Sequence, residues 1–136
     1  MSDKLIQLDI VSPVKTVFSG KVTSITAPGE IGGFQVLHNH APLISSLKIG
    51  TIKVIDENGS EKLFAISSGI LEVKHNVAIV LADAVETQEE IDLARAEQAL
   101  RRAEEILSAE NRLGEKALAK IEAERAKNRI RLAGNK

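Results

Sequence analysis

Thr87-Gln88-Glu89-Glu90 divides this sequence into two parts of different composition. All three prolines, all three phenylalanines and seven of the nine glycines lie within the first 69 residues, whereas all seven arginines lie within the last 42. Thr87 and Glu90 have the spacing of a capping box, in which a threonine and a glutamate satisfy each other's backbone amides at the start of a helix. The sequence therefore predicts a β-rich domain over residues 1–86 and a helical domain over residues 87–136.

Segments with a period of two fill the first part. Ile6, Leu8 and Ile10 alternate with Gln7 and Asp9, which predicts a strand with one buried face. Similar short segments recur up to residue 83. Their spacing is typical of an antiparallel β-sandwich or barrel.

Turn signals separate these segments. A hairpin is expected over residues 14–27 about Ser19-Gly20, and further hairpins about Asn58-Gly59 and Asn76. Residues 28–33, which contain three glycines, are expected to form an open loop.

After Thr87 the apolar residues recur at spacings of three and four. Leucine and alanine alternate in this way through the first predicted helix, and the pattern breaks between residues 110 and 114. The second predicted helix carries a stripe of small residues, Ala119, Ala123, Ala126, Ile130 and Ala133. Alanine lets two helix backbones approach closely, so we expect the two helices to form an antiparallel hairpin. Because alanine buries little apolar area, we expect separation of the two helices to cost little free energy.

Composition excludes several classes of protein. The formal net charge is −1 and there is no cysteine, so neither a general attraction to nucleic acid nor disulfide, thiolate or cysteine-zinc chemistry is expected. Tryptophan and tyrosine are absent, which argues against a base-stacking surface. No apolar run has the length of a membrane span, and the first residues lack the pattern of a signal peptide. We therefore expect a cytosolic or peripheral protein that does not insert into the membrane.

Residues 28–44, Pro-Gly-Glu-Ile-Gly-Gly-Phe-Gln-Val-Leu-His-Asn-His-Ala-Pro-Leu-Ile, resemble the loop–strand–loop of the epsilon subunit of bacterial rotary F-type ATP synthases. The likeness extends over residues 67–73 and 82–86 and through the helical part. It implies a β-sandwich of about ten strands followed by a two-helix hairpin. It also implies a non-catalytic subunit of the central stalk that binds the gamma subunit and the ring of c subunits. The complex would lie on the cytoplasmic face of the inner membrane, and the hairpin, when extended toward the alpha and beta subunits, would impede ATP hydrolysis.

Residues 91–96, Ile-Asp-Leu-Ala-Arg-Ala, match the I/L-D-x-x-R-A motif with which some of these subunits bind ATP. Arginine suits this ligand because its guanidinium pairs with phosphate through two hydrogen bonds. The alternative is a helix surface with ordinary ion pairs. There is no P-loop, so ATP would be a regulator, and no cofactor is required. The positions that match the family's nucleotide site are Glu86, Ile91, Asp92, Arg95, Ala96, Arg102, Arg125 and Arg129.

By the same resemblance, the loops around residues 29–40 are expected to contact gamma and the c-ring, although a purely structural role is the alternative. The residues concerned are Gly29, Glu30, Gly32, Gly33, His38 and His40. No third ligand stands near the two histidines, so no metal site is expected. No motif for a catalytic nucleophile or carboxylate pair is present, so no catalytic residue is expected. A free-standing ATP-sensing module is the second functional hypothesis.

Overall fold

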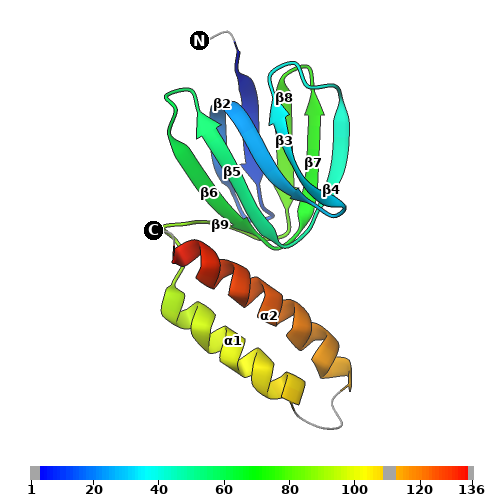
Figure 1. Cartoon of the computed structure of the whole chain (residues 1–136), viewed down its shortest axis with the longest axis vertical. Helices are drawn as coiled ribbons and strands as arrows, with labels where there is room; N and C mark the ends of the chain where they lie inside the picture. Colours follow the sequence, from blue (N-terminus) through cyan, green and yellow to red (C-terminus); the bar gives the residue numbers. More distant parts are fainter. Residues whose placement is uncertain (1–3, 109–112, 135–136) are drawn as a thin grey trace. The chain divides into compact units, whose positions relative to one another are not determined.

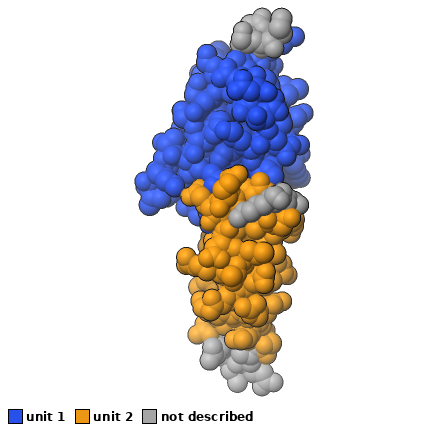
Figure 2. All heavy atoms as spheres, turned by 90° about the vertical axis from the view of Figure 1, so that its left-hand side faces the viewer, with its two compact units in different colours: residues 1–87 blue, residues 88–136 orange. Residues whose placement is uncertain are grey.

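The computed structural model describes residues 4–108 and 113–134. The chain divides into two compact units, residues 1–87 and residues 88–136, which Figure 2 draws in different colours. The first unit is a β-sandwich and the second a pair of helices, so the predicted fold class is confirmed (Figure 1). The strands are β1 (Ile6–Val11), β2 (Thr16–Gly29), β3 (Gly32–Leu37), β4 (Leu43–Leu47), β5 (Gly50–Asp56), β6 (Glu61–Ile66), β7 (Gly69–Lys74), β8 (Val77–Ala82) and β9 (Val85–Thr87).

The long strand β2 belongs to both layers of the sandwich. Its first half pairs with β1, and its second half pairs with β3 and β5. One layer therefore has the order β9-β6-β5-β2-β3 and the other β4-β7-β8-β1-β2. Because β2 is counted in both layers, the nine described strands make two layers of five strands each, which agrees with the expected number of about ten. The pairings are antiparallel except that β1 and β8 run parallel.

Two local predictions in this unit were wrong. Ser19 and Gly20 do not form a turn, because they lie within β2, opposite Asp9 and Leu8 of β1. The pairing with β1 holds this segment extended, and the hydroxyl of Ser19 donates a hydrogen bond to the Asp9 carboxylate over 2.6 Å. The chain instead turns at residues 12–15, where Ser12 N–H bonds Lys15 O.

Residues 28–33 also differ from the expected open loop. Pro28 pairs with Gly33 and Gly29 with Gly32, so only Glu30 and Ile31 form the turn of a two-residue hairpin. The other predicted turns, about Asn58-Gly59 and Asn76, are confirmed between the strand pairs β5–β6 and β7–β8.

One hydrophobic core fills the sandwich. Ile6, Leu8 and Ile10 are fully buried, as their alternation predicted, and Leu71 and Ile52 face them from other strands of the sandwich. Strands β1 to β8 contribute buried residues to this cluster, and the half-buried Val85 of β9 packs against it. The sandwich is therefore a rigid unit whose outward side chains and loops are available for other contacts.

The second unit consists of α1 (Leu93–Ser108) and α2 (Leu113–Ala133), which pack side by side (Figure 1). Ala103 of α1 packs against Ala119 and Ala123 of α2, which confirms the predicted alanine seam. Gln88, before α1, donates a hydrogen bond to the carbonyl of Leu132 near the end of α2 over 3.0 Å, so the helices are antiparallel. Of the predicted break at residues 110–114, residues 110–112 lie outside the described residues, and α2 begins at Leu113. Neither described helix is long and apolar enough to cross a membrane.

Candidate functional site

Asp92, and not Thr87, caps the N-terminus of α1. The Asp92 carboxylate accepts a hydrogen bond from Arg95 N–H over 3.1 Å, and the Asp92 carbonyl accepts the bond from Ala96 N–H over 3.0 Å. Thr87 is held in β9, opposite Phe64 of β6. The prediction that Thr87 is the N-cap of this helix is therefore wrong, because Thr87 is paired in β9 and α1 begins at Leu93, six residues later.

This cap changes how the I/L-D-x-x-R-A motif is understood. Ile91 and Ala96 are buried, with exposed fractions of 3% and 0%, while Asp92 satisfies an amide of the first helical turn. Three of the four residues that define the motif thus have a structural role at the start of α1. Arg95, the fourth of these residues, has an exposed side chain that is available to bind a ligand.

Replacing Asp92 by alanine should weaken the start of α1. Loss of an aspartate N-cap costs about 0.5–2 kcal/mol. We expect faster hydrogen exchange at the amides of Arg95 and Ala96 in the full chain, measured by NMR. Glu104→Ala, an exposed change in the same helix, is the control and should leave those two rates unchanged. Equal exchange in the Asp92 variant and the parent chain would contradict the cap.

The helix register brings three of the four candidate arginines to one level of the hairpin. Ala103 packs beside Ala119 and Ala123, and Gln88 reaches Leu132, so interpolation places Arg95 level with the segment 125–129. That segment carries Arg125, which is exposed, and Arg129, which is half-buried. The arrangement can present several guanidiniums to one anionic ligand.

Arg102 lies apart from this level of the hairpin, and Glu86 belongs to the other unit. Arg102 is exposed two turns further along α1, where it lines a surface hollow of about 270 Å³ together with Gln98, Arg101 and Glu105. Glu86 lies in β9 of the first unit, opposite Ala65, and is half-buried. The mixed charges around Arg102 give that hollow no clear preference for an anion.

The proposed contact loop between β2 and β3 has its shape imposed by glycine. A Cβ on Gly29 would lie 2.6 Å from the carbonyl oxygen of Gly32 and 2.9 Å from the Phe34 ring, so no larger residue fits there. Gly32 has a φ of 148°, which side chains rarely allow. The loop presents Glu30 and Gly32, and it also presents Ile31, which is fully exposed. Ile31 was not among the predicted contact residues, although an isolated apolar residue between glycines is a signal for it.

The β3–β4 loop carries the two histidines. The His40 ring contacts the Ala41 carbonyl through Nδ1 over 2.7 Å, and His40 N–H bonds Leu37 O over 3.1 Å. His38 and His40 are both half-buried. Within residues 4–108 and 113–134, no three histidine or carboxylate side chains are placed to hold a metal ion. Gly33, the last of the predicted contact residues, is exposed and pairs with Pro28.

The layer that contains β4, β7 and β8 has apolar side chains on its outer side. We name this surface the outer apolar face, formed by Ile44, Ile70, Val77 and Leu81, whose exposed fractions are 74%, 47%, 53% and 52%. Ile70 lies directly opposite Leu81 in the pairing of β7 with β8. Leu81 in turn lies opposite the half-buried Val11 of β1. Apolar side chains are therefore neighbours across β7, β8 and β1 at this point, whereas Ile44 and Val77 lie opposite the exposed Glu72 and Lys74.

The outer apolar face was not predicted from the sequence, although the composition of β8 indicates it. β8 has six consecutive apolar residues, Val-Ala-Ile-Val-Leu-Ala. A strand with one face in water normally alternates with polar residues, whereas a strand covered on both faces is apolar throughout. Ala78, Val80 and Ala82 are buried inside the sandwich, which leaves Val77, Ile79 and Leu81 outside.

The comparisons with known proteins cover both units. The family described as "ATP synthase, Delta/Epsilon chain, beta-sandwich domain" matches residues 5–88, and "ATP synthase, Delta/Epsilon chain, long alpha-helix domain" matches residues 89–134. The chain is 50% identical over 108 residues to the ATP synthase epsilon chain of Pelotomaculum thermopropionicum, covering 79% of this chain and 80% of that one. It is 42% identical over 131 residues to the epsilon chain of Natranaerobius thermophilus, covering 96% and 93%.

Two solved structures have the same fold. One comes from the mitochondrial ATP synthase of Euglena gracilis, in a structure of OSCP, F1 and the c-ring, with a TM-score of 0.84, 22% identity and coverage of 97% of this chain and 82% of that one. The other comes from the central stalk and c-ring of the Tetrahymena thermophila mitochondrial ATP synthase, with a TM-score of 0.63, 18% identity and coverage of 94% and 96%.

Proposed function

Since this chain belongs to the epsilon chains of F-type ATP synthases, we propose that it is a non-catalytic subunit of the rotating central stalk, where it couples rotation of the c-ring to the catalytic head. The observation that supports this proposal best is the outer apolar face. Half-exposed aliphatic side chains that cross adjacent strands are typical of a surface that another protein covers. We propose that the gamma subunit covers the outer apolar face.

The loops at residues 29–40 are the proposed contact with the c-ring. The β2–β3 turn offers Glu30 and the fully exposed Ile31 on a hairpin whose glycines fix its shape. A rigid turn suits contact with a rotating partner because little conformational entropy is lost on binding. Contact with the c-ring would place this chain at the cytoplasmic side of a bacterial inner membrane. It would there be part of a complex that transports protons or another ion.

Co-expression with gamma is the direct test of this function. We expect the full chain to co-purify with a tagged gamma subunit and to remain bound through gel filtration. A chain that binds ATP tightly in isolation but does not join gamma would instead be a free-standing ATP sensor, the second hypothesis from the sequence.

The helical unit is the proposed regulatory part. The fully buried residues of its seam are the alanines Ala103, Ala119 and Ala123, with the half-buried Leu100, Ile106 and Leu107 packed against them. Separating the helices therefore exposes less apolar area than a seam of buried leucines would. The hairpin can therefore exchange its packing for contacts with the alpha and beta subunits at low cost. In that extended arrangement we propose that it inhibits ATP hydrolysis.

Deleting residues 88–136 should release this inhibition. We expect complexes assembled with residues 1–87 to hydrolyse ATP faster than complexes with the full chain, measured as phosphate release. Equal amounts of the truncated and full chain in the purified complex are the control, because lost assembly also changes the rate. An unchanged rate in fully assembled complexes would argue against a regulatory helical unit.

ATP is the proposed ligand of the folded hairpin, and Arg95 and Arg129 are the proposed phosphate contacts. We expect saturable ATP binding to the full chain by calorimetry. The Arg95→Ala, Arg129→Ala variant should lose about 100-fold or more in affinity, since each removes a hydrogen-bonded charge partner of the phosphates. Arg101→Ala, an exposed arginine of α1, is the matched control and should bind as the parent chain does. If the double variant bound ATP with the same affinity as the parent chain, Arg95 and Arg129 would not contact the phosphates.

A further inference from the structure

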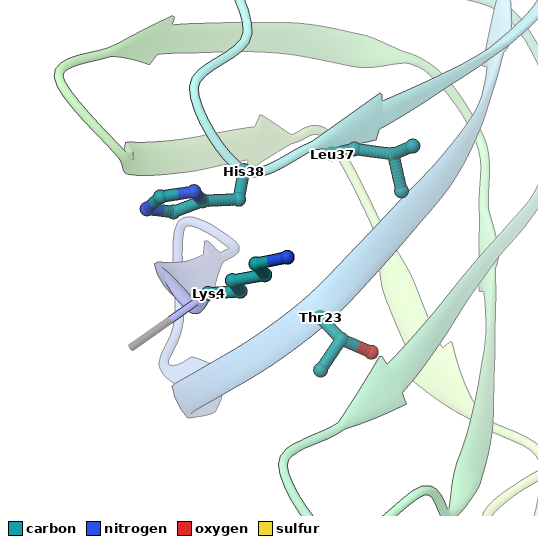
Figure 3. A pocket seen from close by; sticks show the side chains of 4 residues that line it. All are labelled: Lys4, Thr23, Leu37 and His38. Carbon is teal, nitrogen blue, oxygen red and sulfur yellow. The ribbon is translucent and has the colours of Figure 1, made fainter. Parts of the chain in front are cut away.

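A second candidate binding site lies in the sandwich unit, within residues 1–87. A hollow of about 550 Å³ opens beside the start of β1 and is lined by Lys4, Thr23, Leu37 and His38 (Figure 3). Its volume lies in the range of small-molecule sites, roughly 300–1,000 Å³. The four residues come from three separate segments of the chain, which is why no sequence motif marks the site.

The backbone around the hollow is held by a pair of asparagines. Asn39 N–H donates to Asn76 Oδ1 over 2.6 Å, and Asn76 Nδ2 donates to Asn39 Oδ1 over 3.0 Å. Gln7 N–H, at the start of β1, donates to the Asn76 carbonyl over 2.9 Å. The segments that carry His38 and Lys4 are therefore tied to the same turn, with φ of 65° at Asn39 and 59° at Asn76.

The side chains around the hollow have the character of an anion site with an apolar wall. Lys4 supplies an ammonium group and His38 an imidazole, and both side chains border the hollow with Thr23 (Figure 3). Among the described residues, no carboxylate lies within ion-pair distance of Lys4 or His38. Leu37, which is half-exposed, forms an apolar wall.

We propose that this hollow binds a phosphate group, with the Lys4 ammonium as its charge partner and His38 as a hydrogen-bond donor. A lysine ammonium binds phosphate as a point charge, and an imidazole N–H donates to the same oxygens. The phosphate can come from two sources, free inorganic phosphate or the headgroup of an anionic phospholipid. This site is independent of the proposed arginine site on the helices.

Amide NMR of the full chain tests both sources. Inorganic phosphate is titrated in one series, and vesicles of phosphatidylglycerol or of phosphatidylcholine in another. We expect saturable changes at the amides of Thr23, Leu37 and His38 with phosphate or with phosphatidylglycerol. Lys4→Gln and, separately, His38→Gln should weaken that binding about tenfold or more. Lys48→Gln, an exposed lysine elsewhere on the sandwich, is the matched control.

The outcomes separate the sources. Changes with inorganic phosphate that require Lys4 support the site with the free anion as ligand. Changes with phosphatidylglycerol alone that require Lys4 support it with a lipid headgroup as ligand. The proposal is overturned if neither probe shifts these amides, or if the shifts persist in both the Lys4 and the His38 variants. Arg95→Ala should leave the signals unaffected, which distinguishes this site from the helical one.

Discussion

Replacing Ile70 and Leu81 together by glutamate is expected to abolish stable assembly with the gamma subunit. The two side chains lie opposite each other on β7 and β8 within the outer apolar face, so both would be buried by the same partner. An unpaired charge in such an interface must lose its hydration without compensation. We expect the affinity for gamma to fall by about 100-fold or more, measured by co-purification and by interferometry with isolated gamma.

Two controls make this result specific. Val14→Glu places the same charge on a side chain that is 88% exposed in the turn at residues 12–15, and it should bind gamma normally. Two glutamates facing each other can also destabilise the sheet. The Ile70→Ser, Leu81→Ser variant therefore removes apolar surface without adding charge, and it should weaken assembly less. Normal assembly by a folded glutamate variant would show that gamma does not cover this face.

Leu71→Ala should cause the largest loss of stability. Leu71 is adjacent to Ile70 in β7 but points inward, where it is fully buried among Leu8, Ile52 and other core residues. Deleting a buried leucine side chain costs about 2–5 kcal/mol, because transfer energy is lost and a cavity remains. We expect urea to unfold the sandwich at a clearly lower concentration in this variant.

Leu81→Ala is the matched control for that experiment. It removes the same atoms from the outer side of the same layer, where Leu81 is about half-exposed, so its cost should stay below about 1 kcal/mol. The chain has no tryptophan or tyrosine, so unfolding is best followed by NMR amide signals of the sandwich. Similar costs for the two variants would mean that the inward and outward faces of β7 and β8 are wrongly assigned.

Much of the candidate helical site could be predicted from the sequence, but its start could not. The alanine spacing predicted the seam, and Ala103, Ala119 and Ala123 form it. Both Thr87 and Asp92 are suitable N-caps by residue type. Only pairing of Thr87 with Phe64 removes the first of these and leaves Asp92 to cap the helix.

The sequence by itself determined the two-part organisation, the inward face of β1 and the helical hairpin, because each depends on residues close together in the chain. The tertiary structure alone decided that β2 runs unbroken through Gly20, that Ile70 and Leu81 meet on one outer face, and that Lys4 and His38 border one hollow. The physical reason is that periodicity reports which side of an element is apolar. Strand pairing between distant segments decides which of those sides meet, and which of them remain exposed.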